Sequence, residues 1–154
     1  MAESFVTRGG WWVVGQSILL LGVIALGVLF HGQWHSAWGF VIGAVLFVLG
    51  GVVGVAGVRA LGKNRTAFPK PVDGATFVQH GVYSKVRHPL YSSVILVSFG
   101  WGLLWQSGPA LWAAVVIAIF LNSKASREER WLRDKFPEYA EYQRRVSRLI
   151  PWVW

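Results

Sequence analysis

The residues best suited to chemistry lie in two short polar stretches, each next to a long apolar run. The first stretch, HGVYSKVRHPLY (residues 80–91), combines two histidines, a lysine, an arginine, two tyrosines and a proline. The second, NSKASREE (residues 122–129), places Lys124 and Glu128 four residues apart, on one face of a helix. Glu129 is rotated by about 100° from its neighbour and can face elsewhere. Together the stretches offer an imidazole, carboxylates and cations, which make strong hydrogen bonds to a charged ligand.

Pro89 predicts the start of a helix inside the first stretch. Proline suits the first turn of a helix, and the residue before it, His88, is expected to be extended. The free N–H groups and the positive dipole end of such a helix start suit an anion, for example a ligand carboxylate.

Composition excludes several other chemistries. The chain has no cysteine, so a disulfide, a thiolate metal site and a cysteine nucleophile are all excluded. His31 and His35 are four residues apart and could hold a metal, but interfacial polar residues are favoured, and no metal site is predicted. The net charge of +8 could indicate nucleic acid. The basic residues cluster beside the apolar runs instead, as they do in membrane proteins.

Long apolar segments must position the two polar stretches. Hydrophobic residues make up 54% of the 154 residues and charged residues only 14%, which indicates a membrane protein. Four transmembrane helices are predicted, over residues 12–30, 38–58, 90–105 and 110–121. The first has no cleavage pattern after it and is predicted to be a retained anchor. The last two are separated only by QSGP and are predicted to form a tight helical hairpin.

Loop charges predict the orientation of these helices. The first loop and QSGP carry no lysine or arginine, whereas the central loop carries six and the C-terminal segment eight. The positive-inside rule therefore places both termini and the central loop in the cytoplasm. A bacterial-type inner membrane is the expected location. Tryptophans near both predicted boundaries agree with an aromatic belt.

Glycines on the second span predict close helix packing. They recur near helical periods, so they form a stripe through which another helix can approach. A nucleotide-binding glycine loop is not expected, because no strand precedes them. The glycines of this stripe are Gly39, Gly43, Gly50, Gly54 and Gly57.

A basic segment follows the fourth span. Its helix is predicted to continue to about Phe136, before Pro137 breaks it. A second amphipathic helix, over about residues 138–149, is expected at the interface, with Arg144, Arg145 and Arg148 toward lipid phosphates. The predicted fold is therefore an all-α integral membrane protein: four transmembrane helices, the last two a hairpin, and a C-terminal cytoplasmic or interfacial helix. Residues 1–154 are expected to form a single domain.

The predicted hairpin brings the two polar stretches together. In an antiparallel hairpin that turns within QSGP, His88 lies level with Arg127, and Tyr91 lies level with Lys124. Each part alone has a simpler explanation: RHP as an interfacial anchor, the tyrosines as belt residues, the glutamates as solvated charges. Their convergence at one level favours a ligand site at the cytoplasmic mouth.

These stretches and their surroundings resemble the isoprenylcysteine carboxyl methyltransferase and phospholipid methyltransferase superfamily. The matching letters are GATFVQHGVYSKVRHPLY, then EERWLRDKFPEYAEYQRRV and a final IP, within residues 73–151. Gly-x-Tyr, Arg-His-Pro-x-Tyr, Glu-Glu and Tyr-x-x-Tyr in this order make the pattern specific. The first two spans match only in being hydrophobic. The resemblance implies an integral-membrane enzyme that uses S-adenosyl-L-methionine without a Rossmann fold and releases S-adenosyl-L-homocysteine.

The resemblance also implies a cytoplasmic cofactor pocket within residues 73–151. In the carboxyl methyltransferases an arginine lies one helical turn before the cofactor glutamate, where this chain has Lys124. Lysine keeps the charge but loses the two-pronged grip on a carboxylate, which argues against an isoprenylcysteine substrate. The cofactor-binding residues that the resemblance implies are Ala75, Thr76, Phe77, Val78, Tyr83, His88, Pro89, Leu90, Tyr91 and Glu128.

Methyl transfer from a sulfonium is an in-line displacement for which the protein mainly supplies position and excludes water. The acceptor is expected to be lipophilic and to enter from the bilayer. Lys124 and Arg87, the predicted catalytic residues, make the mouth positive together with Arg127. A carboxylate or another anionic nucleophile is favoured, because an ammonium must first lose a proton and no base except the cofactor-bound glutamate is expected within reach. A phospholipid amine and a small thiol are the alternatives.

Two alternatives from other classes stay open. An NADPH-dependent membrane reductase has a similar C-terminal layout, and tight binding of NADPH would favour it. A non-catalytic membrane protein predicts that Tyr83→Phe, His88→Ala and Glu128→Ala leave cofactor binding unchanged.

Overall fold

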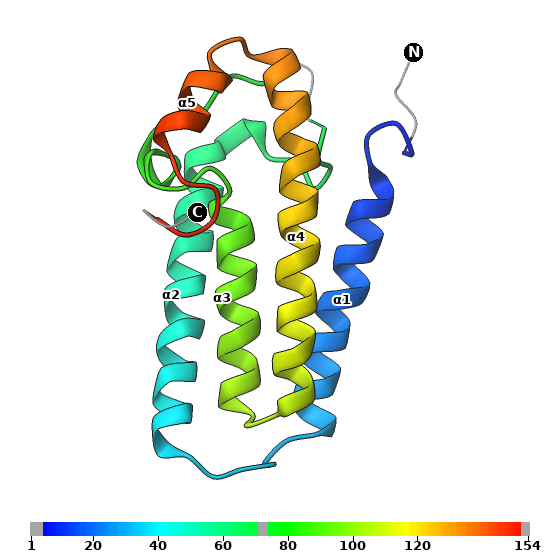
Figure 1. Cartoon of the computed structure of the whole chain (residues 1–154), viewed down its shortest axis with the longest axis vertical. Helices are drawn as coiled ribbons and strands as arrows, with labels where there is room; N and C mark the ends of the chain where they lie inside the picture. The colour runs from blue at the N-terminus through cyan, green and yellow to red at the C-terminus, as the bar shows by residue number, and fades with distance from the viewer. Residues whose placement is uncertain (1–4, 71–73, 152–154) are drawn as a thin grey trace.

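The computed structural model describes residues 5–70 and 74–151, and all of its extended regular elements are helices (Figure 1). Asp73 and Trp154 lie outside the described residues. Within them the β-structure is limited to one isolated parallel bridge between Val86 and Ser147. In chain order the elements are α1 (Gly10–Leu29), α2 (Ala37–Leu61), η1 (Gly62–Asn64), η2 (Gly81–Ser84), α3 (Pro89–Leu104), α4 (Gly108–Lys135) and α5 (Tyr139–Arg145).

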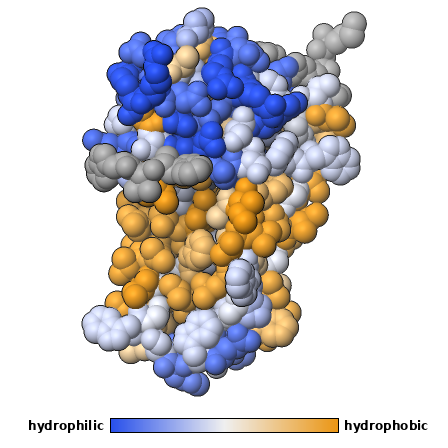
Figure 2. Space-filling model, in the orientation of Figure 1, coloured by the Kyte–Doolittle hydropathy of each residue, from blue (hydrophilic) through white to orange (hydrophobic). Residues whose placement is uncertain are grey.

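Three of these helices, α1, α2 and α4, are long and apolar enough to cross a membrane. Helix α3 has 16 residues and is therefore about 24 Å long. On the face that it draws, Figure 2 shows an apolar band across the helices and a hydrophilic cap at the end where α5 and the last turns of α4 lie. The protein is thus an all-α integral membrane protein, as the composition predicts.

Local signals in the sequence set the helix starts. The Ser36 hydroxyl caps α2 by accepting a hydrogen bond from the Gly39 N–H at 3.0 Å. The Ser107 hydroxyl caps α4 in the same way, 3.4 Å from the Ala110 nitrogen. Pro89 occupies the first turn of α3, as predicted. Only three residues separate α3 from α4, so the two helices run antiparallel and lie side by side (Figure 1).

Four of the five glycines of the predicted stripe lie against α3, which confirms their packing role: Gly43, Gly50, Gly54 and Gly57. The fifth, Gly39, lies near Ser36 and Trp34 instead. A Cβ atom on Gly50 would lie 2.8 Å from the Val97 side chain of α3. In the same way, a Cβ atom on Gly100 of α3 would lie 2.7 Å from the Phe47 nitrogen of α2. At these points the backbones approach too closely for any side chain.

We expect Gly100→Ala to destabilise the protein by about 1–3 kcal/mol, because the added methyl group forces the backbones of α2 and α3 apart. Gly51→Ala is the matched control, since a Cβ atom on Gly51 meets nothing within 4 Å. The measurement is thermal unfolding in detergent. Equal melting temperatures for the two variants would contradict the packing interpretation.

Helix α4 continues past its apolar part without a break and ends at Lys135, just before Phe136 and Pro137, as predicted. Helix α5 is shorter than predicted and covers seven residues, from Tyr139 to Arg145. The chain leaves the helix there because residues 147–148 run beside residues 86–88 instead. Their backbones are joined by two hydrogen bonds, from the Arg87 N–H to the Ser147 carbonyl (2.9 Å) and from the His88 N–H to the Arg148 carbonyl (3.1 Å).

The expected orientation of Arg148 toward lipid phosphates is wrong. Its guanidinium lies 2.9 Å from the Glu129 carboxylate and also donates to Asn122 and Ser126 of α4. Arg144 and Arg145 are exposed. The C-terminal segment therefore turns one of its three arginines into the protein, where it helps to fix the end of the chain.

Candidate active site

The predicted meeting of the two polar stretches is confirmed at the polar end of the bundle. The Tyr91 hydroxyl of α3 donates to Glu128 Oε2 of α4 at 2.6 Å. His88 Nδ1 lies 3.7 Å from the same carboxylate oxygen. The imidazole is stacked parallel to the Tyr91 ring, with ring centroids 5.2 Å apart. Pro89 and the short α3–α4 connection produce this arrangement, because they fix where α3 begins and which part of α4 it faces.

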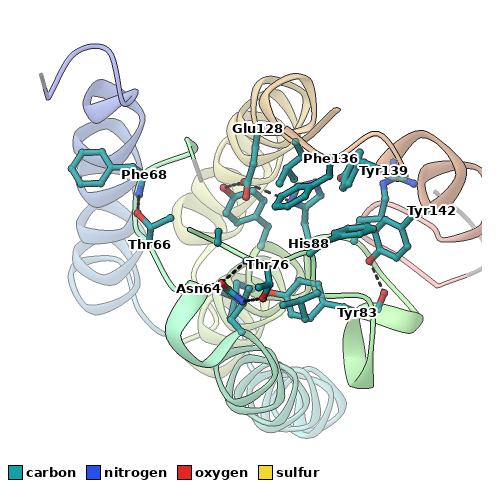
Figure 3. A pocket seen from close by; sticks show the side chains of 18 residues that line it. Asn64, Thr66, Phe68, Thr76, Tyr83, His88, Glu128, Phe136, Tyr139 and Tyr142 are labelled. Atoms are coloured by element: carbon teal, nitrogen blue, oxygen red, sulfur yellow. Dashed lines mark hydrogen bonds and ion pairs between the residues drawn. The ribbon is translucent and has the colours of Figure 1, made fainter. Parts of the chain in front are cut away.

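These side chains line a cavity between the end of α2, the start of α3, α4 and α5 (Figure 3). Nine of the ten predicted cofactor-binding residues line it: Ala75, Thr76, Phe77, Val78, Tyr83, His88, Leu90, Tyr91 and Glu128. The tenth, Pro89, is buried beside them and is not in contact with the cavity.

Asn64 fixes the segment that enters the cavity from the central loop. The Thr76 N–H donates to Asn64 Oδ1 at 3.0 Å, and Asn64 Nδ2 donates to the Thr76 hydroxyl at 3.1 Å (Figure 3). Residues 76–78 of this segment form no strand in the structure. The side-chain amide of Asn64 in η1, just after α2, therefore orders this loop.

Aromatic rings form another wall of the cavity. Phe77 stacks on Phe136 with centroids 5.5 Å apart and meets the Tyr142 ring edge-on at 5.1 Å. The Tyr142 hydroxyl donates to the Tyr83 carbonyl at 2.5 Å (Figure 3). Burial raises the pKa of Tyr83 and of Tyr142 far above the usual value for tyrosine, so both stay protonated. The Tyr139 hydroxyl is buried and finds no hydrogen-bond partner among the described residues.

Glu129 lies next to the cavity and binds four side chains. Its Oε1 accepts from Arg87 Nε at 2.8 Å and from His88 Nε2 at 3.1 Å. Its Oε2 accepts from Gln143 Nε2 at 2.8 Å and from Arg148 Nη2 at 2.9 Å. The residue is only 1% exposed. A buried carboxylate needs such partners, and here they come from the two residues just before α3, from α5 and from the C-terminal segment.

The cations that the sequence places at the mouth are engaged within the protein. Lys124 is 2% exposed and does not line the cavity; its Nζ donates to Gln16 Oε1 of α1 at 2.6 Å and to the Ala67 carbonyl at 3.4 Å. Its Nζ also lies 5.3 Å from the centroid of the Tyr91 ring. Arg127 stacks over Trp131 at 4.9 Å.

Arg87 does line the cavity, but its guanidinium is also occupied. Besides the ion pair with Glu129, its Nη1 donates to the carbonyls of Gln143 and Val146. Arg87 thus connects the start of α3 to α5 and the C-terminal segment.

Several lining residues were not predicted from the sequence. The Tyr-x-x-Tyr pattern contains two of them and could have revealed them, because it belongs to the resemblance. The residues near the end of α2 carry no comparable signal, since single polar residues in a basic loop are ordinary. The unpredicted lining residues are Leu61, Asn64, Thr66, Phe68, Leu132, Phe136, Tyr139 and Tyr142.

Comparison with known proteins identifies the class of protein that has this fold and site. The family model described as phospholipid methyltransferase matches residues 38–139. The chain is 32% identical over 158 residues to the cobalt-zinc-cadmium resistance protein CzcN of Cupriavidus metallidurans, covering 97% of this chain and 67% of the relative. It is 29% identical over 146 residues to protein-S-isoprenylcysteine O-methyltransferase B of Arabidopsis thaliana, covering 92% and 74%.

A solved structure shares the fold. The eukaryotic intramembrane Ras methyltransferase ICMT (isoprenylcysteine carboxyl methyltransferase) matches with a TM-score of 0.68 and 21% identity, over 94% of this chain. The chain spans about half of that protein, 53% of its length. The chain belongs to the phospholipid methyltransferase family. The predicted resemblance to this superfamily is thereby confirmed.

Proposed function

We propose that this protein is an integral-membrane methyltransferase that uses S-adenosyl-L-methionine and acts on a lipid-like or prenylated acceptor. The observation that carries the proposal is the cavity at the polar end of the helix bundle, where Glu128, Tyr91 and His88 face an aromatic wall in a chain of this family. When bound, the cofactor supplies a methyl group that is already activated on a sulfonium. The protein then has to bind, orient and exclude water.

The cavity residues fit this cofactor. A carboxylate such as Glu128 suits the ammonium group of the cofactor. The rings of Phe77 and Phe136 suit a purine, since aromatic planes stack. The Tyr139 hydroxyl is buried without a partner among the described residues, so it is available as a donor. We therefore propose that the nine lining residues predicted from the sequence bind the cofactor and that Pro89 shapes the start of α3.

Lys124 and Arg87 are proposed to act at the acceptor end of the site. Lys124 joins α4 to α1 through Gln16, and its ammonium lies near the ring of Tyr91. Arg87 holds the wall of the cavity through Glu129. Both cations have partners within the protein, so they are proposed to act through the shape of the site and its electrostatic field.

The membrane arrangement proposed with this function has four spans. Helices α1, α2 and α4 qualify by length, and α3 is proposed to be a short fourth span because it lies between α2 and α4 in the apolar band. Residues 1–154 are proposed to be one domain, with its cofactor-binding part in residues 73–151 and its termini in the cytoplasm of a bacterial-type inner membrane. A reporter fused after Trp154 should read as cytoplasmic, and a periplasmic signal would contradict this orientation.

Isothermal titration of the detergent-purified protein tests the function directly. We expect micromolar affinity for S-adenosylmethionine and S-adenosylhomocysteine and at least tenfold weaker binding of NADPH, a difference of about 1.4 kcal/mol or more. Transfer of a radiolabelled methyl group into a lipid extract should follow. Tight binding of NADPH would favour a membrane reductase instead, and binding of neither cofactor would favour a non-catalytic protein.

A further inference from the structure

We propose that His88 is the proton acceptor of this site, that Glu129 is the residue that positions it, and that the methyl acceptor therefore carries a proton on its attacking atom. Such an acceptor is an ammonium or a thiol. This inference rests on the proposed methyltransferase function and names the chemical class of its acceptor.

The first step concerns the charge of Glu129. Its two oxygens accept four hydrogen bonds, two of them from the guanidinium groups of Arg87 and Arg148. Guanidinium groups stay protonated in proteins, and a carboxylate beside two of them stays ionised. An ionised carboxylate can only accept hydrogen bonds. His88 Nε2, which lies 3.1 Å from Oε1, must therefore carry a hydrogen.

The second step concerns the other ring nitrogen. With the hydrogen fixed on Nε2, a neutral His88 ring presents a lone pair at Nδ1. This atom faces Glu128 Oε2 at 3.7 Å, beyond the reach of a hydrogen bond. That oxygen already accepts the Tyr91 hydroxyl hydrogen at 2.6 Å. In the described part of the chain Nδ1 thus has no hydrogen-bond partner, and both His88 and Glu128 line the cavity.

The third step concerns the charge that an acceptor would meet. Arg87 and Glu128 are the charged side chains, apart from His88, among the described residues that line the cavity. Arg87 forms an ion pair with Glu129, whereas Glu128 accepts a hydrogen bond from the Tyr91 hydroxyl and is proposed to pair with the ammonium group of the cofactor. Neither carboxylate then presents a free negative charge to the acceptor, so the class of acceptor follows from the base at His88 Nδ1. The sequence alone favours a carboxylate acceptor, because no base except the cofactor-bound glutamate is expected within reach. In the structure, His88 provides such a base.

The proton and electron movements balance. The proton of the acceptor N–H or S–H moves to His88 Nδ1, and the lone pair left on nitrogen or sulfur bonds to the methyl carbon. The methyl–sulfonium bond breaks, and its electron pair stays on the sulfur as a thioether. The positive charge lost by the sulfonium is matched by the charge gained by the imidazole.

The imidazolium formed in this way is stabilised by its surroundings. It lies between the carboxylates of Glu128 and Glu129 of α4, with the Tyr91 ring of α3 stacked on it. Arg87 and Arg148 both form ion pairs with Glu129. Positioned bases of this kind contribute about 10²- to 10⁴-fold to a rate.

The variant His88→Gln tests the basic ring nitrogen separately from the hydrogen bond to Glu129. The glutamine amide can still donate to Glu129 from the place of Nε2, but it has no basic nitrogen. The assay compares phosphatidylethanolamine vesicles, dodecanethiol and palmitate as methyl acceptors for the whole protein. We expect transfer to the amine or the thiol and not to the carboxylate, and a loss of about 100-fold or more in His88→Gln. Transfer to palmitate alone, or a His88→Gln rate within about threefold of the original chain, would overturn the proposal.

A second measurement needs neither cofactor nor activity. Nitrogen NMR of histidine-labelled protein in detergent reports which ring nitrogen carries the hydrogen, and the His88 signal is the one lost in His88→Gln. We expect a neutral ring with the hydrogen on Nε2, a changed tautomer ratio in Glu129→Gln, and no change in Glu141→Gln, an exposed glutamate paired with Arg145. A hydrogen on Nδ1, or on both nitrogens at pH 8, would overturn the proposal. Failure of cofactor binding would instead reject the proposed function and leave this result standing.

Discussion

Glu128→Gln should weaken the binding of S-adenosylhomocysteine by about 10- to 100-fold, because hydrogen bonds to a charged group contribute about 1.5–3 kcal/mol. The side chain of Glu128 is 25% exposed and lines the cavity, and among the described residues its carboxylate accepts one hydrogen bond, from the Tyr91 hydroxyl. Little of the fold depends on its charge, so the loss should be confined to the ligand. Isothermal titration measures the affinity.

Tyr91→Phe is the control for this result. It removes the hydroxyl that donates to Glu128 and keeps the carboxylate and the stacked ring, so a loss smaller than that of Glu128→Gln is expected. Thermal unfolding should give nearly the same melting temperature for all three proteins. Unchanged affinity in Glu128→Gln would show that this glutamate does not hold the cofactor.

Glu129→Ala should cause the largest loss of stability of any single substitution at this site, about 3–5 kcal/mol. The carboxylate is 1% exposed, and its removal leaves the guanidinium groups of Arg87 and Arg148 without their anion. Removing one partner of a buried ion pair is costly because the remaining charge stays desolvated. Thermal unfolding in detergent measures the effect.

Glu141→Ala provides the matched comparison. Glu141 also forms an ion pair, with Arg145 at 3.6 Å, but both side chains are more than 60% exposed. Exposed pairs of this kind contribute about 0.3–0.5 kcal/mol on a helix. Similar melting temperatures for Glu129→Ala and Glu141→Ala would show that the buried network does not hold the C-terminal segment in place.

The sequence predicts the site to the extent that local signals decide it. Pro89 fixes the start of α3 and the short QSGP segment fixes the partner of that helix, so the meeting of the two polar stretches could be predicted from spacing. Spacing places Tyr91 level with Lys124, whereas its hydroxyl binds Glu128, one helical turn further along α4. The stripe of α2 could be predicted for the same reason, because helical periodicity shows which residues share a face.

The rest depends on contacts between distant parts of the chain. The rule that places basic residues near lipid phosphates gives the wrong orientation for Arg148, because the pairing of residues 147–148 with residues 87–88 turns its side chain toward Glu129. The role of Asn64 likewise depends on its hydrogen bonds to Thr76, which lies twelve residues later in the chain. Neither contact leaves a periodic pattern that a single sequence could reveal.

The short length of α3 has a consequence for where the cavity lies. A helix of about 24 Å covers less than the hydrocarbon thickness of about 30 Å, whereas the antiparallel α4 runs on well past it. If α3 is a short fourth span, as proposed, and the far ends of both helices lie at one interface, the floor of the cavity lies several ångströms beneath the headgroup plane. A lipophilic acceptor could then bring its reactive group into the cavity while its hydrocarbon chain stays in the bilayer. A water-soluble ligand would enter the interface only to a small depth. The proposed arrangement thus places a shallow cavity between lipid and water. A lipophilic acceptor can then stay in the lipid and a water-soluble molecule in the water.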